Sequence, residues 1–164
     1  MKVLNEKKGF TLIELLAVIV VLAIVMVLAA TTVLPYMANA RKQAFATEAE
    51  TVKKAASQAV SLIGIGSVTD ASKYTKTTNG YCFTVQNLKD LGLFEKDDAN
   101  YAGVVEVTKS GNNYTYLVKM KNSEFYVSQT TAGSINATSD VKDVTTGDAA
   151  KPTTTEVPST CTSS

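Results

Sequence analysis

The most constraining feature of the chain is a long apolar segment close to its N-terminus. The sequence FTLIELLAVIVVLAIVMVLAATTVL occupies positions 10–34, and every residue from Leu15 to Ala30 is apolar. A helix that crosses a bilayer needs roughly 20 mostly apolar residues, so this segment is long enough to do so. Glu14 nevertheless lies near its beginning. A carboxylate within a membrane span is costly enough to indicate a function and a partner.

The charged residues are almost balanced, which bears on the class of partner. The chain has 16 Lys and Arg against 15 Asp and Glu. Without residues 1–9, which hold three lysines and one glutamate, the balance is 13 against 14. This balance argues against binding to nucleic acid or another polyanion through bulk charge, although it leaves room for a local basic patch.

The residue types do not predict an enzyme. The chain has no histidine, so the commonest general base and metal ligand is missing. The sequence shows no glycine-rich phosphate loop, no cysteine and histidine metal cluster, and no Ser/His or Cys/His pair. We therefore expect no catalytic residue, no cofactor and no bound metal.

The residues before the apolar segment indicate its orientation. Residues 1–9, MKVLNEKKG, are polar and cationic, and positive charge beside an apolar span stays in the cytoplasm. Everything after Leu34 is therefore expected on the outside. A secretory signal peptide would have a shorter apolar core, although Ala38-Asn39-Ala40 would supply a cleavage site. A plain membrane anchor would explain the length of the segment but not Glu14.

The stretch KKGFTLIELL, at positions 7–16, accounts for all of these features. It resembles the processing motif of type IV prepilins and of the related pseudopilins of type II secretion. In that family a basic leader ends in glycine, a hydrophobic residue follows, usually Phe, and a glutamate stands at a fixed distance inside the mature chain. By this resemblance, Gly9 is the last leader residue, Phe10 the mature N-terminus and Glu14 the family's glutamate.

The resemblance implies a sequence of processing and assembly steps. A prepilin peptidase in the membrane would cut after Gly9 on the cytoplasmic side and methylate the amine of Phe10. Glu14 would then pair with the charged Phe10 nitrogen of a neighbouring subunit, since two buried charges are less costly as a pair. The expected partners are other copies of the chain, the peptidase and methyltransferase, the assembly machinery and the cytoplasmic membrane. The final location would be a pilus on the cell surface.

Helical periodicity continues beyond the apolar segment. The apolar residues recur on one face of a helix, namely Phe45, Ala49, Val52, Ala56, Ala59 and Ile63. Gly64 and Gly66 are expected to end this helix. On its polar side, Glu50 and Lys54 are spaced for a favourable pair.

Pro35 lies between the two halves of the expected helix. Proline removes the hydrogen bond to the carbonyl of Thr31 and crowds that turn, so a kink is expected at Pro35. Many pilins have a helix-breaking proline four residues earlier, where this chain has Thr31, and often a glycine where it has Ala23. Any unwinding during assembly is therefore expected between Thr31 and Pro35.

The region after Ile63 predicts a small globular domain. Residues 64–80 are polar and rich in Gly and Thr, which indicates a linking loop, and Thr84 is placed to cap a short helix that closes at Gly92. Alternating apolar residues then predict three antiparallel strands at 103–109, 114–120 and 124–129. Their common face is expected to cover the alanine-rich helix face with Val105, Val107, Tyr116, Val118, Met120, Phe125 and Val127. The predicted fold class is α+β, with a long helix packed against a small three-stranded antiparallel sheet, as in pilins.

The last part of the chain contains few large apolar residues. From Thr130 onward it is rich in Thr, Ser, Ala and Asp and would be poorly ordered alone. The two cysteines, Cys82 and Cys161, suit one disulfide in an exported domain, the alternative being two unrelated thiols. A bond between them would fold the tail over the sheet. The resemblance supports it, because many pilins tie a C-terminal loop this way.

The expected organisation is a leader at 1–9, a membrane and assembly helix at 10–35, an amphipathic helix half at 36–63 and an outward domain at 64–164. The favoured function is a structural subunit of a type IV pilus filament. A minor pilin or a pseudopilin of a type II secretion or DNA-uptake machine would share these features. A membrane-tethered binding module, in which Glu14 is incidental, belongs to another class. The sequence does not choose among adhesion, motility, biofilm growth and DNA uptake.

Overall fold

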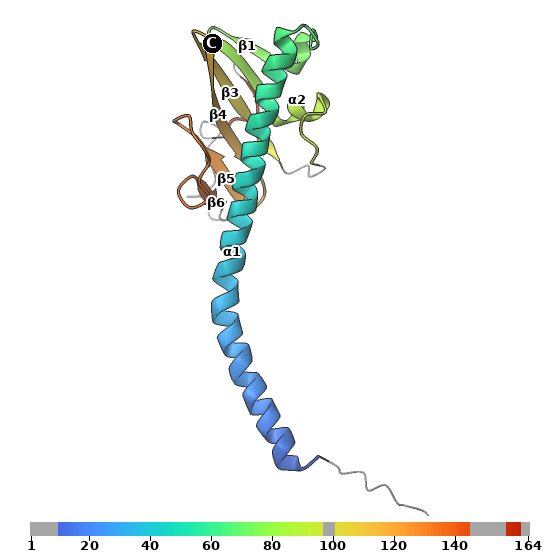
Figure 1. Cartoon of the computed structure of the whole chain (residues 1–164), viewed down its shortest axis with the longest axis vertical. Helices are drawn as coiled ribbons and strands as arrows, with labels where there is room; N and C mark the ends of the chain where they lie inside the picture. Colours follow the sequence, from blue (N-terminus) through green and yellow to red (C-terminus); the bar gives the residue numbers. More distant parts are fainter. Residues whose placement is uncertain (1–9, 97–100, 145–156, 162–164) are drawn as a thin grey trace, which may run out of the picture. The chain divides into compact units, whose positions relative to one another are not determined.

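The computed structural model describes residues 10–96, 101–144 and 157–161. The leader expected at 1–9, with Gly9, lies outside these residues. The chain divides into two compact units, Met1–Ala38 and Asn39–Ser164, and helix α1 (Leu12–Gly64) contributes to both. The other elements are the 3-10 helix η1 (Ala71–Lys73), the helix α2 (Val85–Asp90) and the strands β1 (Thr75–Thr77), β2 (Gly80–Thr84), β3 (Ala102–Ser110), β4 (Asn113–Lys121), β5 (Phe125–Ser128) and β6 (Val141–Asp143) (Figure 1).

Helix α1 is continuous from Leu12 to Gly64 and includes Pro35. At its C-terminal end, the backbone N–H of Gly66 donates to the carbonyl of Ile63 at 3.0 Å, and that of Ser67 donates to the carbonyl of Leu62 at 2.9 Å. Gly66 has a φ of 74°, a left-handed conformation that glycine adopts without strain. The helix therefore ends in a Schellman motif, at the glycines that were expected to end it.

In the second unit, α1 buries the apolar face that its periodicity predicts. The predicted residues are buried, apart from the half-buried Ile63: Phe45, Ala49, Val52, Ala56 and Ala59. Three further residues widen this face: Ala46, Ala55 and Val60. These side chains share one hydrophobic core with the buried residues of the sheet, so the expected helix-on-sheet core is confirmed.

The sheet has six antiparallel strands in the order β1-β2-β3-β4-β5-β6, so the predicted count of three is wrong. The predicted strands correspond to β3, β4 and β5. The other three are short, and β1 and η1 lie inside the segment that was predicted to be a linking loop. Pairing with neighbouring strands, rather than any pattern within these short segments, produces their extended conformation.

Strand register places the predicted apolar residues on one face of the sheet. Val105 pairs with Val118, and Val107 pairs with the half-buried Tyr116. The buried members of this face are Val105, Val107, Val118, Met120, Phe125 and Val127, as predicted. They form one core with the buried face of α1, whose second half crosses this side of the sheet (Figure 1).

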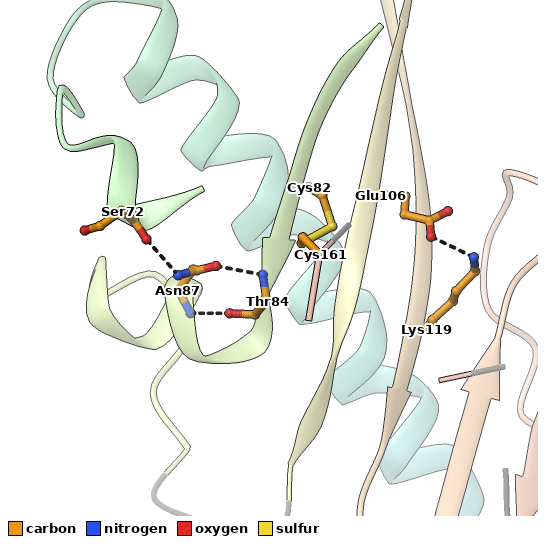
Figure 2. Close-up of a disulfide and its surroundings, with 7 residues drawn as sticks. All are labelled: Ser72, Cys82, Thr84, Asn87, Glu106, Lys119 and Cys161. Atoms are coloured by element: carbon orange, nitrogen blue, oxygen red, sulfur yellow. Dashed lines mark hydrogen bonds and ion pairs between the residues drawn. A yellow bond between two sulfur atoms is a disulfide. The ribbon is translucent and has the colours of Figure 1, made fainter. Parts of the chain in front are cut away.

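Thr84 caps α2 as predicted. Its hydroxyl accepts a hydrogen bond from the backbone N–H of Asn87 at 3.0 Å, and the Asn87 side chain accepts one from the backbone N–H of Thr84 at 3.0 Å (Figure 2). The side-chain amide of Asn87 also donates to the carbonyl of Ser72 at 3.4 Å. This reciprocal capping box therefore fixes the start of α2 and also ties it to η1.

A disulfide joins Cys82 of β2 to Cys161 (Figure 2). Successive side chains of a strand point to opposite faces, and Phe83 points into the core, so Cys82 lies on the outer face of the sheet. Val157, close to Cys161 in the chain, is buried. The described part of the tail, residues 157–161, is therefore tied to the outer face of the sheet.

Charged side chains of α1 hold the segment between β5 and β6. The carboxylate of Glu50 accepts a hydrogen bond from the backbone N–H of Ile135 at 2.6 Å. Lys53 lies 3.4 Å from Glu50 and also donates to the carbonyl of Gly133. The structure thus pairs Glu50 with Lys53 rather than with Lys54, because Lys53 faces this segment while Lys54 is exposed.

Candidate processing and assembly site

The candidate site lies at the start of α1. Phe10 precedes the helix and is 88% exposed, and Thr11 is the last residue before the helix begins. Glu14 lies in the first turn. Gly9 lies outside the described residues, so the geometry of the site is described from Phe10 onward.

Thr11 and Glu14 form a capping box. The backbone N–H of Thr11 donates to the Glu14 carboxylate at 2.8 Å, and the Thr11 hydroxyl donates to the same oxygen at 2.9 Å. In return, the backbone N–H of Glu14 lies 3.4 Å from the Thr11 hydroxyl oxygen. The acid also lies at the positive end of the helix dipole. Within a single chain, Thr11 is therefore the partner that Glu14 requires.

The role of Thr11 was not predicted, although the sequence contains the pattern for it. Residues 11–14 read T-L-I-E, and Ser or Thr followed three residues later by Glu is the pattern of a capping box. It also precedes a long apolar run, which is the usual context of a helix start. The pattern of the processing motif and the pattern of the cap share the same two residues.

The apolar surface that follows the site is uncovered. The large apolar side chains described between Phe10 and Met37 are between 49% and 88% exposed. An 18-residue window within α1 has a mean hydropathy of 3.2, so this helix is long and apolar enough to cross a membrane. Such a surface requires lipid or other apolar helices around it.

The other predicted residues lie elsewhere. Pro35 is inside α1 toward the end of the first unit, and the Cys82–Cys161 disulfide belongs to the second unit. Among the residues that the structure describes, no group of three or more His, Cys, Asp or Glu side chains is placed to hold a metal ion. The structure thus brings Thr11 to Glu14 and Cys82 to Cys161.

Comparison with known proteins identifies the N-terminal region. A family model described as the prokaryotic N-terminal methylation motif matches residues 4–30, which include Gly9, Phe10 and Glu14. No curated protein and no solved structure matches the chain. The motif points to a structural protein rather than to an enzyme, and to attachment to a membrane through the apolar helix. The N-terminal region therefore carries the methylation motif of type IV prepilin-like proteins, which supports processing by a prepilin peptidase.

Proposed function

We propose that the chain is the structural subunit of a type IV pilus filament and that it polymerises through the helix at 10–35. The observation that carries the proposal is a capped acid at the start of an otherwise uncovered apolar helix. A helix that only anchored a domain in lipid would gain from Glu14 no more than the cap of its first turn. In a helix that packs against identical helices, Glu14 would form a polar contact at one fixed position. This contact would prevent the apolar helices from sliding along one another.

Cleavage after Gly9 would create a new positive charge beside this helix. Glycine suits the cleavage position because it has no side chain to obstruct the extended backbone in a peptidase site. One methyl group on the Phe10 nitrogen leaves its charge in place. The Phe10 nitrogen of one subunit would then pair with Glu14 of the next, and this pairing would set the axial register of the filament.

The same helix would serve in two environments. Before assembly it would lie in the cytoplasmic membrane, with the second unit on the outer side, as the cationic residues at 1–9 favour. In the filament, the apolar side chains of neighbouring subunits would replace the lipid. The exposed apolar surface from Phe10 to Met37 supports this exchange, because nothing within the described residues of the same chain covers it.

The decisive experiment combines peptide mass spectrometry with electron microscopy of a sheared surface fraction. The mature chain is expected to begin at Phe10 with one methyl group on its nitrogen, and this chain is expected to be the main component of visible filaments. Gly9→Val is the matched variant, and it should remain uncleaved. A surface chain that still begins at Met1, or one cut after Ala40, would contradict the proposal.

Abundance separates the filament subunit from its alternatives. A minor pilin or a pseudopilin would also begin at methylated Phe10, but it would be scarce in the sheared fraction. A membrane-tethered binding module would stay with the cells and would carry no methyl group on Phe10.

A further inference from the structure

A polar hollow of about 330 Å³ lies at the tips of two neighbouring hairpins in the second unit. One hairpin joins β1 to β2, and the other joins β3 to β4. The residues that matter for its chemistry are Lys76, Asn79, Tyr81, Lys109 and Tyr114. The volume is at the lower end of the range of small-molecule sites.

Strand register places these side chains on one face. Lys76 pairs with Tyr81, Tyr81 pairs with Val107, and Lys109 pairs with Tyr114. Val107 belongs to the buried face of the sheet, so the lysines and tyrosines extend that face beyond the apolar core. The backbone N–H of Lys109 donates to the carbonyl of Asn79 at 2.6 Å, which ties the two turns together. The walls of the hollow are therefore fixed to each other.

The hollow is locally positive in a chain whose overall charge is close to neutral. Lys76 and Lys109 are exposed, and neither forms an ion pair with any acid among the described residues. The nearby Lys73 differs, because it pairs with Asp90 at 3.6 Å. Glu106, on the opposite face of β3, pairs with Lys119 at 2.7 Å (Figure 2).

The two lysines are positioned to share one anion. They lie on the same face, two strands apart and offset by two residues along the strands, which corresponds to about 12 Å between their backbones. Like charges on one face of a sheet repel each other, and a carboxylate held between them would relieve the repulsion. Each long side chain would reach the anion from one side of the hollow.

The aromatic rings of the hollow are already in contact with other groups. Tyr81 packs edge-on against Tyr74 at 5.6 Å between ring centres, and Lys109 lies 5.7 Å from the centre of the Tyr114 ring. Nucleic-acid sites without sequence preference depend on open rings on which bases stack. The hydroxyl and amide groups that line this hollow are better suited to the hydroxyls of a sugar.

We propose that the hollow between Lys76 and Lys109 binds an acidic saccharide, with the sugar's carboxylate held by the two lysines and its hydroxyls by Asn79 and the tyrosine hydroxyls. This inference goes beyond the proposed filament function. It concerns the second unit alone and does not depend on filament formation.

The test measures binding of trigalacturonate by isothermal titration calorimetry to the full mature chain in a non-ionic detergent. Trigalacturonate methyl ester is the matched ligand, since it keeps the shape and hydroxyls but lacks the charge. Lys76→Gln and Lys109→Gln should each weaken binding about tenfold, the loss typical of one charge-assisted hydrogen bond. Lys54→Gln, at an exposed lysine of α1 outside the hollow, should bind like the original chain. Thermal unfolding followed by circular dichroism checks that each variant is folded.

Three results would overturn the inference. The first is no binding of trigalacturonate by the original chain. The second is equal binding of the acid and its methyl ester, or equal binding by the original chain and the two lysine variants. The third is binding of a single-stranded oligothymidylate without binding of trigalacturonate, which would indicate a nucleic-acid surface instead. Because the assay uses the unassembled chain, none of these results depends on filament formation.

Discussion

The carboxylate of Glu14 accepts two hydrogen bonds from Thr11, one from the backbone N–H at 2.8 Å and one from the hydroxyl at 2.9 Å. The acid at the start of the apolar helix is therefore satisfied within its own chain before any second subunit arrives. A carboxylate that enters lipid without such bonds is costly. In the proposed filament, the Phe10 nitrogen of a neighbouring subunit would become an additional or a replacement partner for Glu14.

Glu14→Ala is expected to separate processing from assembly. The variant should still insert and should still be cleaved after Gly9, because cleavage takes place on the other side of Phe10. Assembly should fall strongly, since the Phe10 nitrogen would have no carboxylate to meet. Filament yield in the sheared fraction and the mass of the N-terminal peptide measure the two effects separately.

Glu14→Gln is the control for the capping role of this side chain. Its side-chain oxygen can still accept the Thr11 hydrogen bonds, but it carries no charge. It should therefore keep the start of the helix intact and still assemble poorly. Normal filaments from either variant would contradict intersubunit pairing through Glu14.

Those parts of the fold that have a strong internal period were predictable from the sequence. The face of α1 from Phe45 to Ala59 follows helical spacing, and β3 and β4 alternate apolar and polar residues over part of their length. The α2 cap at Thr84 was predictable because its side chain bonds within four residues. The same kind of short-range pattern would have predicted the capping box of Thr11 and Glu14.

The short outer strands were not predictable, because tertiary contacts produce them. β1 and β6 have three residues each, and only Val141 among the six is buried. Strand β6 follows a segment that Glu50 of α1 holds through the backbone N–H of Ile135. The residues near Val141 in the sequence do not indicate this contact with Glu50. For the same reason, the sequence did not indicate that Glu50 pairs with Lys53 rather than with Lys54.

The disulfide should supply a large share of the stability of the second unit. Cys82 and Cys161 are 79 residues apart in the chain. Closing a loop of this size stabilises by about 4 kcal/mol in the chain-entropy model. Cys82→Ser combined with Cys161→Ser should lower the free energy of unfolding in urea by an amount of this order.

The reduced original chain is the matched control for the double serine variant. Dithiothreitol should destabilise the original chain to a similar extent and should leave the variant unchanged. Free thiols on the mature exported protein, measured by non-reducing mass spectrometry, would contradict the disulfide.

Gly103 is a position where only glycine fits. Its φ is 147°, and a Cβ atom there would lie 2.2 Å from the carbonyl oxygen of Lys119 and 2.5 Å from the Cα of Met120. Both are backbone atoms of the paired strand, so neither can turn aside as a side chain would. Gly103→Ala should therefore destabilise the second unit by about 2 kcal/mol or more, as strained or overpacked positions do.

Gly64→Ala is the matched control, because a Cβ atom there meets nothing within 4 Å. Gly64 is the last residue of α1, where alanine is the better helix former, so the change should be neutral or slightly stabilising. Urea denaturation of both variants measures the difference. Equal stability of the two variants would show that β3 and β4 do not approach each other this closely at Gly103.

Tyr101 should make the second unit sensitive to alkaline pH. Burial, together with the hydrogen bond that its hydroxyl donates to Glu48, raises the pKa of Tyr101 above its ordinary value. The folded state thus favours the protonated phenol. Its contribution to stability is complete below the unfolded pKa of about 10 and is lost as the pH rises through the folded pKa.

Tyr101→Phe should reduce the part of the alkaline loss that begins near pH 10, at a cost of about 1 kcal/mol at neutral pH for the lost hydrogen bond. Tyr114→Phe, at a half-buried tyrosine of the β3–β4 hairpin, should leave that loss in place. Unfolding in urea at a series of alkaline pH values provides the comparison. An unchanged pH profile for Tyr101→Phe would contradict this role.

The turn from Thr31 to Pro35 is expected to be the weakest part of α1. This turn is helical in the structure, and the Thr31 hydroxyl donates to the carbonyl of Leu28 at 3.0 Å. Proline has no N–H, so the carbonyl of Thr31 lacks the hydrogen bond that residue 35 would give in an ordinary helix. A hydroxyl bonded back to the preceding turn also favours bending. Any unwinding on assembly should therefore centre on this turn.

Pro35→Ala should restore the missing bond and stabilise the helix there by about 3 kcal/mol. Hydrogen exchange of the backbone amides around residue 33 should then slow down, both in detergent and in filaments. Val33→Ala is the matched control, because it leaves every backbone hydrogen bond in place and should exchange like the original chain. Equal exchange in the original chain and in Pro35→Ala, or a filament map of the original chain in which this turn is fully helical, would refute unwinding at Pro35.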